Sequence, residues 1–64
     1  MYKYYSIHRP VGPGTFPNQG KVREIVNFEG REFVTEIGRE AWGYLIYIEP
    51  LTEAEMVNYE LVSA

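Results

Sequence analysis

Residues 41–61, with the sequence AWGYLIYIEPLTEAEMVNYEL, limit the possible folds more than any other part of the chain. Every residue from 42 to 48 is apolar or aromatic except Gly43, and these β-branched and aromatic side chains favour a strand that is buried on both faces. Proline has no N–H to donate to a neighbouring strand, so Glu49 and Pro50 end this strand. The segment therefore predicts a buried strand with a defined stop.

A helix is predicted directly after this stop. Thr52 and Glu55 have the spacing of a capping box, in which each side chain accepts a hydrogen bond from the backbone N–H of the other residue. Leu51 and Met56 stand at the two positions of a hydrophobic staple. We expect the helix over residues 53–61, and a helix this short must dock on the sheet because it is marginal alone in water. The docking residues expected on it are Met56, Val57, Tyr59 and Leu61.

The first half of the chain predicts further strands separated by loops. Residues 2–7 are rich in tyrosine and have the length of a strand. Residues 9–20 contain so many prolines and glycines that they must form a loop. Residues 21–28 alternate as a second strand, Glu29-Gly30 suits a hairpin turn, and residues 31–37 continue as a third strand.

These elements together predict one fold class. We expect a single α+β domain over residues 1–64, with a three- or four-stranded antiparallel sheet and one C-terminal helix packed on one face. One alternative stays open in the middle of the chain. Residues 35–41 tolerate a short helical turn as well as a strand, because most of them have fair helix propensity.

The composition indicates a small domain that depends on its aromatic residues. The chain has 64 residues and no cysteine, and it has six Tyr, three Phe and one Trp. A chain of this size buries only about 60% of its unfolded surface, so large aromatic side chains must supply much of the core. We find no signal-peptide pattern and no apolar run of membrane-spanning length, and we expect a cytoplasmic protein.

The charge of the chain argues against nucleic-acid binding. The formal net charge is −3 and the pI is near 5.0, whereas a nucleic-acid footprint needs clustered Lys and Arg. An alternative remains, because aromatic side chains on a sheet can stack on bases. In that alternative a tyrosine-bearing sheet face would act together with Lys21, Arg23 and Arg31.

No pattern in the sequence indicates catalysis or a cofactor. His8 is the single histidine, and neither a cysteine nor a serine at triad spacing accompanies it. The spacings typical of metal ligands are absent, and Glu36 and Glu40 fit a solvated surface better than a metal site. We therefore expect a protein that is not an enzyme and that needs no cofactor or metal.

The strand that is apolar on both faces suggests a binding surface, because one short helix can cover only one side of it. If the helix covers Trp42, Tyr44, Ile46 and Ile48, then Leu45 and Tyr47 lie on the opposite face. Either the loop carrying Phe16 folds over them, or a partner does. We expect partial cover by the loop, with the remaining patch used for recognition. We therefore predict partner binding at Phe16, Leu45 and Tyr47, with another protein or a second copy of the chain as the partner.

Four short segments carry a resemblance to a known group of proteins. They read YYSI-x-RPV at 4–11, with position 8 left open, EIGREAWGY at 36–44, PLT at 50–52 and YEL at 59–61. Together they resemble small proteins encoded on conjugative and other mobile elements of Gram-positive bacteria. The resemblance implies a bacterial cytosolic setting and an accessory role in maintaining the element or in countering host defence. It carries over no functional residues.

Overall fold

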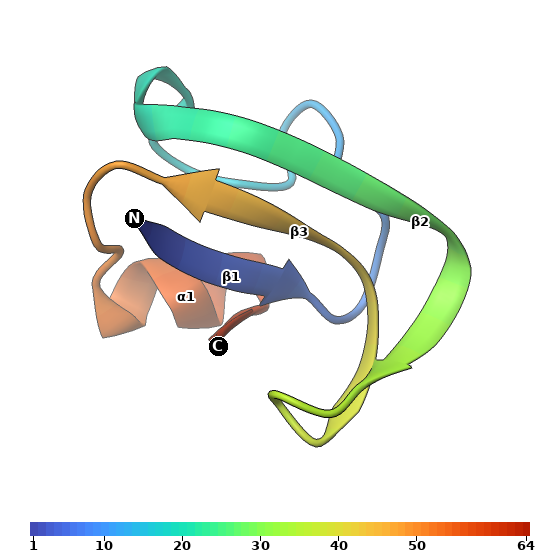
Figure 1. Ribbon diagram of the computed structural model, residues 1–64. Helices are drawn as coiled ribbons and strands as arrows, with labels where there is room; N and C mark the ends of the chain where they lie inside the picture. Colours follow the sequence, from blue (N-terminus) through green and yellow to red (C-terminus); the bar gives the residue numbers. More distant parts are fainter.

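The computed structural model describes residues 1–64 and has the α+β architecture that the sequence predicts. The strands are β1 (Tyr2–Ser6), β2 (Val22–Val34), β3 (Arg39–Tyr47) and β4 (Leu61–Ser63), and the helix α1 covers Glu53–Tyr59. A 3-10 turn, η1 (Gln19–Lys21), precedes β2. The strands form one antiparallel sheet in the order β2-β3-β1-β4, and α1 lies on one face of it (Figure 1).

The hairpin turn lies later in the chain than the sequence predicts. The expected turn at Glu29-Gly30 is wrong, because β2 runs through these residues as one strand. The irregularity there is a bulge: Asn27 pairs with Gly43 but Glu32 pairs with Ala41, so extra residues of β2 face a short stretch of β3. The turn that joins the two strands covers residues 35–38, where Gly38 has a φ of 67°. Residues 35–41 therefore form a turn and the start of β3, and no helix.

The helix begins as predicted and ends two residues early. The Thr52 side chain accepts from Glu55 N–H, the Glu55 side chain accepts from Thr52 N–H, and the capping box is confirmed. The backbone N–H of Thr52, together with the Asn18 side chain, holds the pKa of Glu55 below its usual value. Glu60 then adopts a left-handed conformation with φ 55°, which ends the helix and turns the chain into β4, a strand that the sequence analysis missed.

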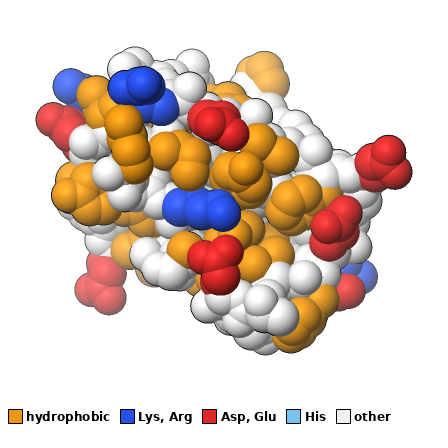
Figure 2. Space-filling model, viewed as in Figure 1, with side chains coloured by type: hydrophobic (Ala, Val, Ile, Leu, Met, Phe, Trp, Pro, Cys, Tyr) orange, Lys and Arg blue, Asp and Glu red, His pale blue; other side chains and the backbone are white.

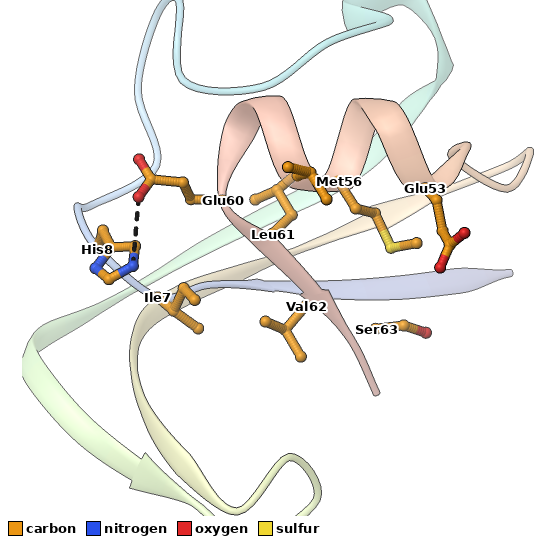
Figure 3. Close-up of a pocket in the computed structure, with 9 residues that line it drawn as sticks. Ile7, His8, Glu53, Met56, Glu60, Leu61, Val62 and Ser63 are labelled. Atoms are coloured by element: carbon orange, nitrogen blue, oxygen red, sulfur yellow. Dashed lines mark ion pairs between the residues drawn. The ribbon is translucent and has the colours of Figure 1, made fainter.

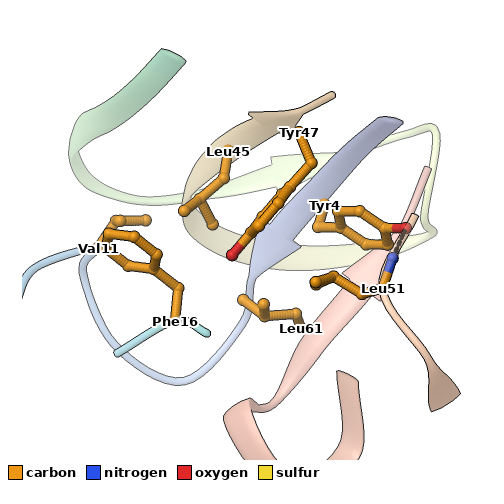
Figure 4. Packing of buried hydrophobic residues seen from close by; sticks show 7 residues of the cluster. All are labelled: Tyr4, Val11, Phe16, Leu45, Tyr47, Leu51 and Leu61. Carbon is orange, nitrogen blue, oxygen red and sulfur yellow. Dashed lines mark hydrogen bonds between the residues drawn. The ribbon is translucent and has the colours of Figure 1, made fainter. Parts of the chain in front are cut away.

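The core lies on the face of the sheet that α1 and the loop of residues 7–20 cover. It is a cluster from β1, β3, β4, the loop and the start of the helix, namely Tyr4, Val11, Phe16, Leu45, Tyr47, Leu51 and Leu61 (Figure 4). Met56 and Tyr59 of α1 pack against this cluster, as predicted for docking residues, whereas Val57 is 73% exposed. Leu51 and Met56 thus meet at the core, as the hydrophobic staple predicts.

Two buried tyrosines join the covering segments to the sheet. The Tyr4 and Tyr47 rings meet edge to face with their centres 5.6 Å apart. The Tyr4 hydroxyl accepts a hydrogen bond from Leu51 N–H at 2.8 Å, and the Tyr47 hydroxyl donates one to the Pro17 carbonyl at 2.6 Å. Each ring therefore packs in the core while its polar end bonds to the backbone of a covering segment.

The assignment of sheet faces in the sequence analysis is wrong. The helix does not cover Trp42, Tyr44, Ile46 and Ile48; it lies on the face that carries Leu45 and Tyr47, both of which are fully buried. The loop carrying Phe16 covers this same face, so helix and loop share one side. The physical reason is that the hydroxyls of Tyr4 and Tyr47 need hydrogen-bond partners when buried, and the backbone of Leu51 and Pro17, outside the sheet, supplies them on this side.

One side-chain amide fixes the loop to β2. Asn27 accepts a hydrogen bond from Val11 N–H at 2.8 Å and donates one to the Val11 carbonyl at 2.9 Å, so it pairs with Val11 as a neighbouring strand would. Asn27 of β2 pairs with Gly43 of β3, and a Cβ added at position 43 would come within 2.3 Å of the Val26 carbonyl oxygen. Only glycine fits at position 43, and the loop depends on this close approach.

Replacing the helix cap should destabilise the domain. We expect Thr52→Ala to lower the free energy of unfolding by about 0.5–2 kcal/mol, because it removes the side-chain acceptor for Glu55 N–H. In a domain of this size such a loss lowers the melting temperature by several degrees. Thr52→Ser, which keeps the acceptor oxygen, is the matched control and should melt close to the wild type. An unchanged melting curve for Thr52→Ala would show that the cap does not stabilise the fold.

The buried Tyr47 hydroxyl should make stability fall at high pH. Burial raises the pKa of Tyr47 from 10.0 to about 12, with the charge of Glu55 adding to the effect. The unfolded chain therefore loses this proton first, and the free energy of unfolding should decline as the pH rises from 10 to 12. Urea unfolding at several pH values in this range measures the decline. Tyr47→Phe should show a smaller decline, from a lower starting stability, whereas the exposed control Tyr2→Phe should behave as the wild type.

Candidate interaction surface

The face of the sheet opposite the helix carries a second group of apolar side chains. We call it the open face and define it by alternation along the paired strands as Lys3, Tyr5, Glu24, Val26, Phe28, Trp42, Tyr44, Ile46 and Val62. Figure 2 looks onto this face and shows apolar side chains spread across it, with a cation near the middle and carboxylates around it. Most of its residues are half-buried, and only Tyr5 is fully buried.

A row of paired residues crosses the open face from one edge of the sheet to the other. Val26 lies beside Tyr44, Tyr44 beside Tyr5, and Tyr5 beside Val62. The Tyr5 and Tyr44 rings meet edge to face with centres 5.8 Å apart, and the Phe28 ring lies 6.2 Å from Tyr44. This packing holds the aromatic rings in fixed positions, so the face is a firm apolar surface.

A single cation lies over the two tyrosines of this row. Lys3 Nζ is 4.3 Å from the centre of the Tyr44 ring and 5.1 Å from that of Tyr5. Glu36, from the turn between β2 and β3, accepts a hydrogen bond from the Tyr5 hydroxyl at 2.8 Å and lies 3.7 Å from Lys3 Nζ. Hydrogen bonding to Tyr5, with the charges of Tyr5 and Glu36, raises the pKa of Lys3, so this side chain stays cationic.

The residues predicted for partner binding lie in the core. Leu45 and Tyr47 have no exposed area, and Phe16 packs with them in the same cluster. The sequence analysis considered either the loop carrying Phe16 or a partner as the cover for Leu45 and Tyr47, and in the structure the loop lies there. Partner binding by these three residues stays an untested prediction, and in this conformation their side chains do not reach the surface.

The polar residues considered for catalysis have structural partners. His8 lies 3.3 Å from a carboxylate oxygen of Glu60, which also pairs with Arg9, and Arg9 holds the pKa of Glu60 below its usual value. Ser6 is buried and donates its hydroxyl proton to the Arg9 carbonyl, so it does not face His8 as a nucleophile would. No group of three or more His, Cys, Asp or Glu converges as metal ligands would.

The cations that a nucleic-acid surface would need are mostly paired. Lys21 lies 3.6 Å from Glu49, and Arg31 lies 3.1 Å from Glu40, which leaves Arg23 as the one member of the predicted set without an ion pair. The fully buried Tyr5 offers no ring face to a base. These pairings weaken the alternative of base stacking on a basic sheet.

No helix of the structure is long and apolar enough to cross a membrane.

The open face itself was missed in the sequence analysis, although the alternation of Trp42, Tyr44 and Ile46 was recognised there. The sequence did not indicate which face of the sheet the helix covers. The tyrosine hydroxyls that set this side have their partners in distant segments, so spacing along the chain does not show it.

Comparison with known proteins assigns the chain to one family. The family model described as "Defence against restriction A C-terminal" matches residues 1–64. No curated protein and no solved structure matches the chain. The match supports association with a phage or mobile element, which is the coarser part of the resemblance seen in the sequence. Nothing in it tests the narrower origin in conjugative elements of Gram-positive bacteria.

Proposed function

The chain belongs to the Defence against restriction A C-terminal family, and on that premise we propose that it is a non-enzymatic accessory module of a mobile element that acts by binding another protein. The open face is the proposed binding surface. In this proposal the helix and the loop stabilise the domain from behind, and the face that they leave uncovered recognises the partner.

The observation that carries this proposal is the composition of the open face. Half-buried Trp42, Tyr44 and Ile46 alternate along β3, on the side of the sheet opposite α1. Aromatic side chains are enriched in the centres of protein interfaces, where charged residues are depleted. The one lysine on the face is neutralised by Glu36, which lowers the cost of removing it from water.

The absence of a catalytic arrangement among the polar residues also supports a binding role. His8 and Ser6 each have a structural partner, and neither is directed at the open face. In this proposal the domain contributes recognition, and any chemistry in the defence process belongs to other proteins.

Charged substitutions on the open face should abolish partner binding and leave the fold intact. Ile46→Lys places a cation opposite Glu24 of β2, and this opposite charge offsets the repulsion from Lys3 of β1 on the other side, so the strand should tolerate it. We expect at least a tenfold loss of affinity, because a charge in the centre of an interface must be removed from water when the partner binds. The control Asn58→Lys adds the same charge on an exposed position of α1.

The measurement has two stages. The wild-type chain is immobilised and used to capture proteins from the native host, and the affinity of the most abundant captured protein is then measured with purified samples. A partner that binds Ile46→Lys as tightly as the wild type, while both variants keep the wild-type circular dichroism spectrum, would refute the open face as the binding surface.

The proposal also predicts no binding to nucleic acid and no catalytic activity. Gel shifts with single- and double-stranded DNA at physiological salt should show no complex, because the net charge is −3 and the basic residues are mostly paired. A complex that is lost on Arg23→Ala would favour the nucleic-acid alternative instead. An activity of the purified chain that disappears on His8→Ala would show that the domain is an enzyme.

A further inference from the structure

Two donors on the open face meet on one carboxylate oxygen of the chain itself. The Tyr5 hydroxyl donates a hydrogen bond to Glu36 Oε1 at 2.8 Å, and Lys3 Nζ lies 3.7 Å from the same atom. A hydroxyl donor and a cation that converge on one oxygen suit a carboxylate, which only accepts hydrogen bonds and carries the opposite charge. We call Lys3 Nζ and the Tyr5 hydroxyl together the carboxylate receptor.

The sheet positions both donors of the carboxylate receptor. Lys3 and Tyr5 are two residues apart on β1, so both side chains lie on the open face. Lys3 Nζ is 4.3 Å from the centre of the Tyr44 ring, and the Tyr5 ring packs edge to face against the same ring. The Tyr5 side chain is also fully buried, which limits its movement. The receptor is therefore organised before a ligand arrives.

Glu36 is held in the receptor by few contacts. It belongs to the turn of residues 35–38 between β2 and β3, and its side chain is 55% exposed. Its two contacts both involve Oε1, and Oε2 makes no hydrogen bond within the chain. Ion pairs with this much exposure contribute little to stability. The Glu36 side chain can therefore rotate into water while the sheet keeps its packing.

Glu60 provides a comparison with a carboxylate that is part of the framework. Both of its oxygens are in contact, Oε1 with Arg9 and Oε2 with His8 at 3.3 Å, at one end of the groove between α1 and β4 (Figure 3). Its backbone ends α1 in a left-handed conformation, directly before β4 begins. Glu36 has neither feature, because it uses one oxygen and lies in an exposed turn.

We propose that the carboxylate receptor binds an acidic side chain of the partner protein, and that Glu36 fills the receptor until that side chain replaces it. This inference rests on the function proposed for the open face and names the chemistry of its partner. The class of ligand follows from the chain's own occupant, which is a carboxylate. Half-buried Trp42 and Ile46 lie on either side of Tyr44 along β3, so the acidic side chain must stand on an apolar part of the partner surface.

Glu36 also makes the receptor selective. A partner that covers the open face takes Lys3 out of water, which costs free energy unless a carboxylate stays beside it. A partner with an acidic side chain supplies that carboxylate, whereas one with a cation at this point meets the like charge of Lys3. Because Glu36 competes for the receptor, the apparent affinity for the partner falls in proportion to the fraction of chains in which Glu36 occupies it.

The first test measures the receptor without any partner protein. Phenylacetate joins a carboxylate to an apolar ring, and NMR titrations that follow the Lys3 and Tyr5 signals give its dissociation constant. We expect Glu36→Ala to bind phenylacetate at least about fivefold more tightly than the wild type, because the internal competitor is gone. Glu32→Ala, the matched control, removes an exposed carboxylate of the same hairpin and should bind as the wild type does. Phenylacetamide, which has no charge, should not distinguish Glu36→Ala from the wild type.

The second test removes each donor from the Glu36→Ala chain. Lys3→Met keeps the apolar part of the side chain, and Tyr5→Phe keeps the ring. Each should weaken phenylacetate binding at least about fivefold, because each removes one of the two contacts to the carboxylate. Circular dichroism checks that the variants keep the fold. A Glu36→Ala chain that binds no more tightly than the wild type would overturn the proposal, and so would a gain that survives both donor substitutions.

The protein captured from the native host separates this inference from the proposed function. We expect Lys3→Met to weaken its binding at least about tenfold and Glu36→Ala to strengthen it. A captured protein whose affinity falls for Ile46→Lys but is unchanged by Lys3→Met and Glu36→Ala would overturn the carboxylate receptor and leave the open face as the binding surface. A captured protein that is indifferent to Ile46→Lys would refute the open face, whatever the phenylacetate titrations show.

Discussion

The fold depends on the hydrogen-bonding requirement of two buried hydroxyl groups. Tyr4 and Tyr47 supply much of the core area, but each brings a polar atom that loses its water on burial. The Leu51 N–H and the Pro17 carbonyl supply the missing partners, and both belong to segments outside the sheet. The helix and the loop must therefore lie on the side of the sheet where these hydroxyls emerge. This one requirement decides which face becomes core and which stays open.

In the function that we propose, the division into two faces also separates stability from recognition. Residues on the covered side pack against the helix and the loop, so substitutions there change the free energy of unfolding. On the open face the rings of Tyr44 and Phe28 contact each other, and Lys3, which pairs with Glu36, lies over the Tyr44 ring. Both aromatic side chains remain partly exposed to solvent. The binding surface that we propose is therefore firm, and it leaves the core covered.

Local patterns in the sequence were sufficient for the elements that local interactions define. The capping box and a strand over residues 42–48 that stops at Glu49-Pro50 follow from short-range chemistry. The structure confirms the capping box and has the strand as Arg39–Tyr47, but only one of its faces is fully buried, since Trp42, Tyr44 and Ile46 are half-buried. The predicted turn at Glu29-Gly30 failed because Gly30 can also occupy a bulge, and only pairing with β3 decides between the two. The end of the helix failed because Glu60 adopts a conformation usually left to glycine, stabilised by contacts with distant residues. The open face could not be predicted, because the partners of Tyr4 and Tyr47 lie far away in the sequence.

The link between Asn27 and Val11 has a consequence for how the molecule ages. Asparagine side chains hydrolyse slowly to aspartate, which replaces the amide nitrogen with an oxygen. At position 27 this conversion would keep the acceptor for Val11 N–H but remove the donor to the Val11 carbonyl, and a carboxylate would then face a carbonyl oxygen. The loop that covers Leu45 and Tyr47 would keep one of its two hydrogen bonds to Asn27 of β2 and would have a repulsive contact in place of the other. Chemical damage to a single exposed amide could therefore limit the working lifetime of this domain.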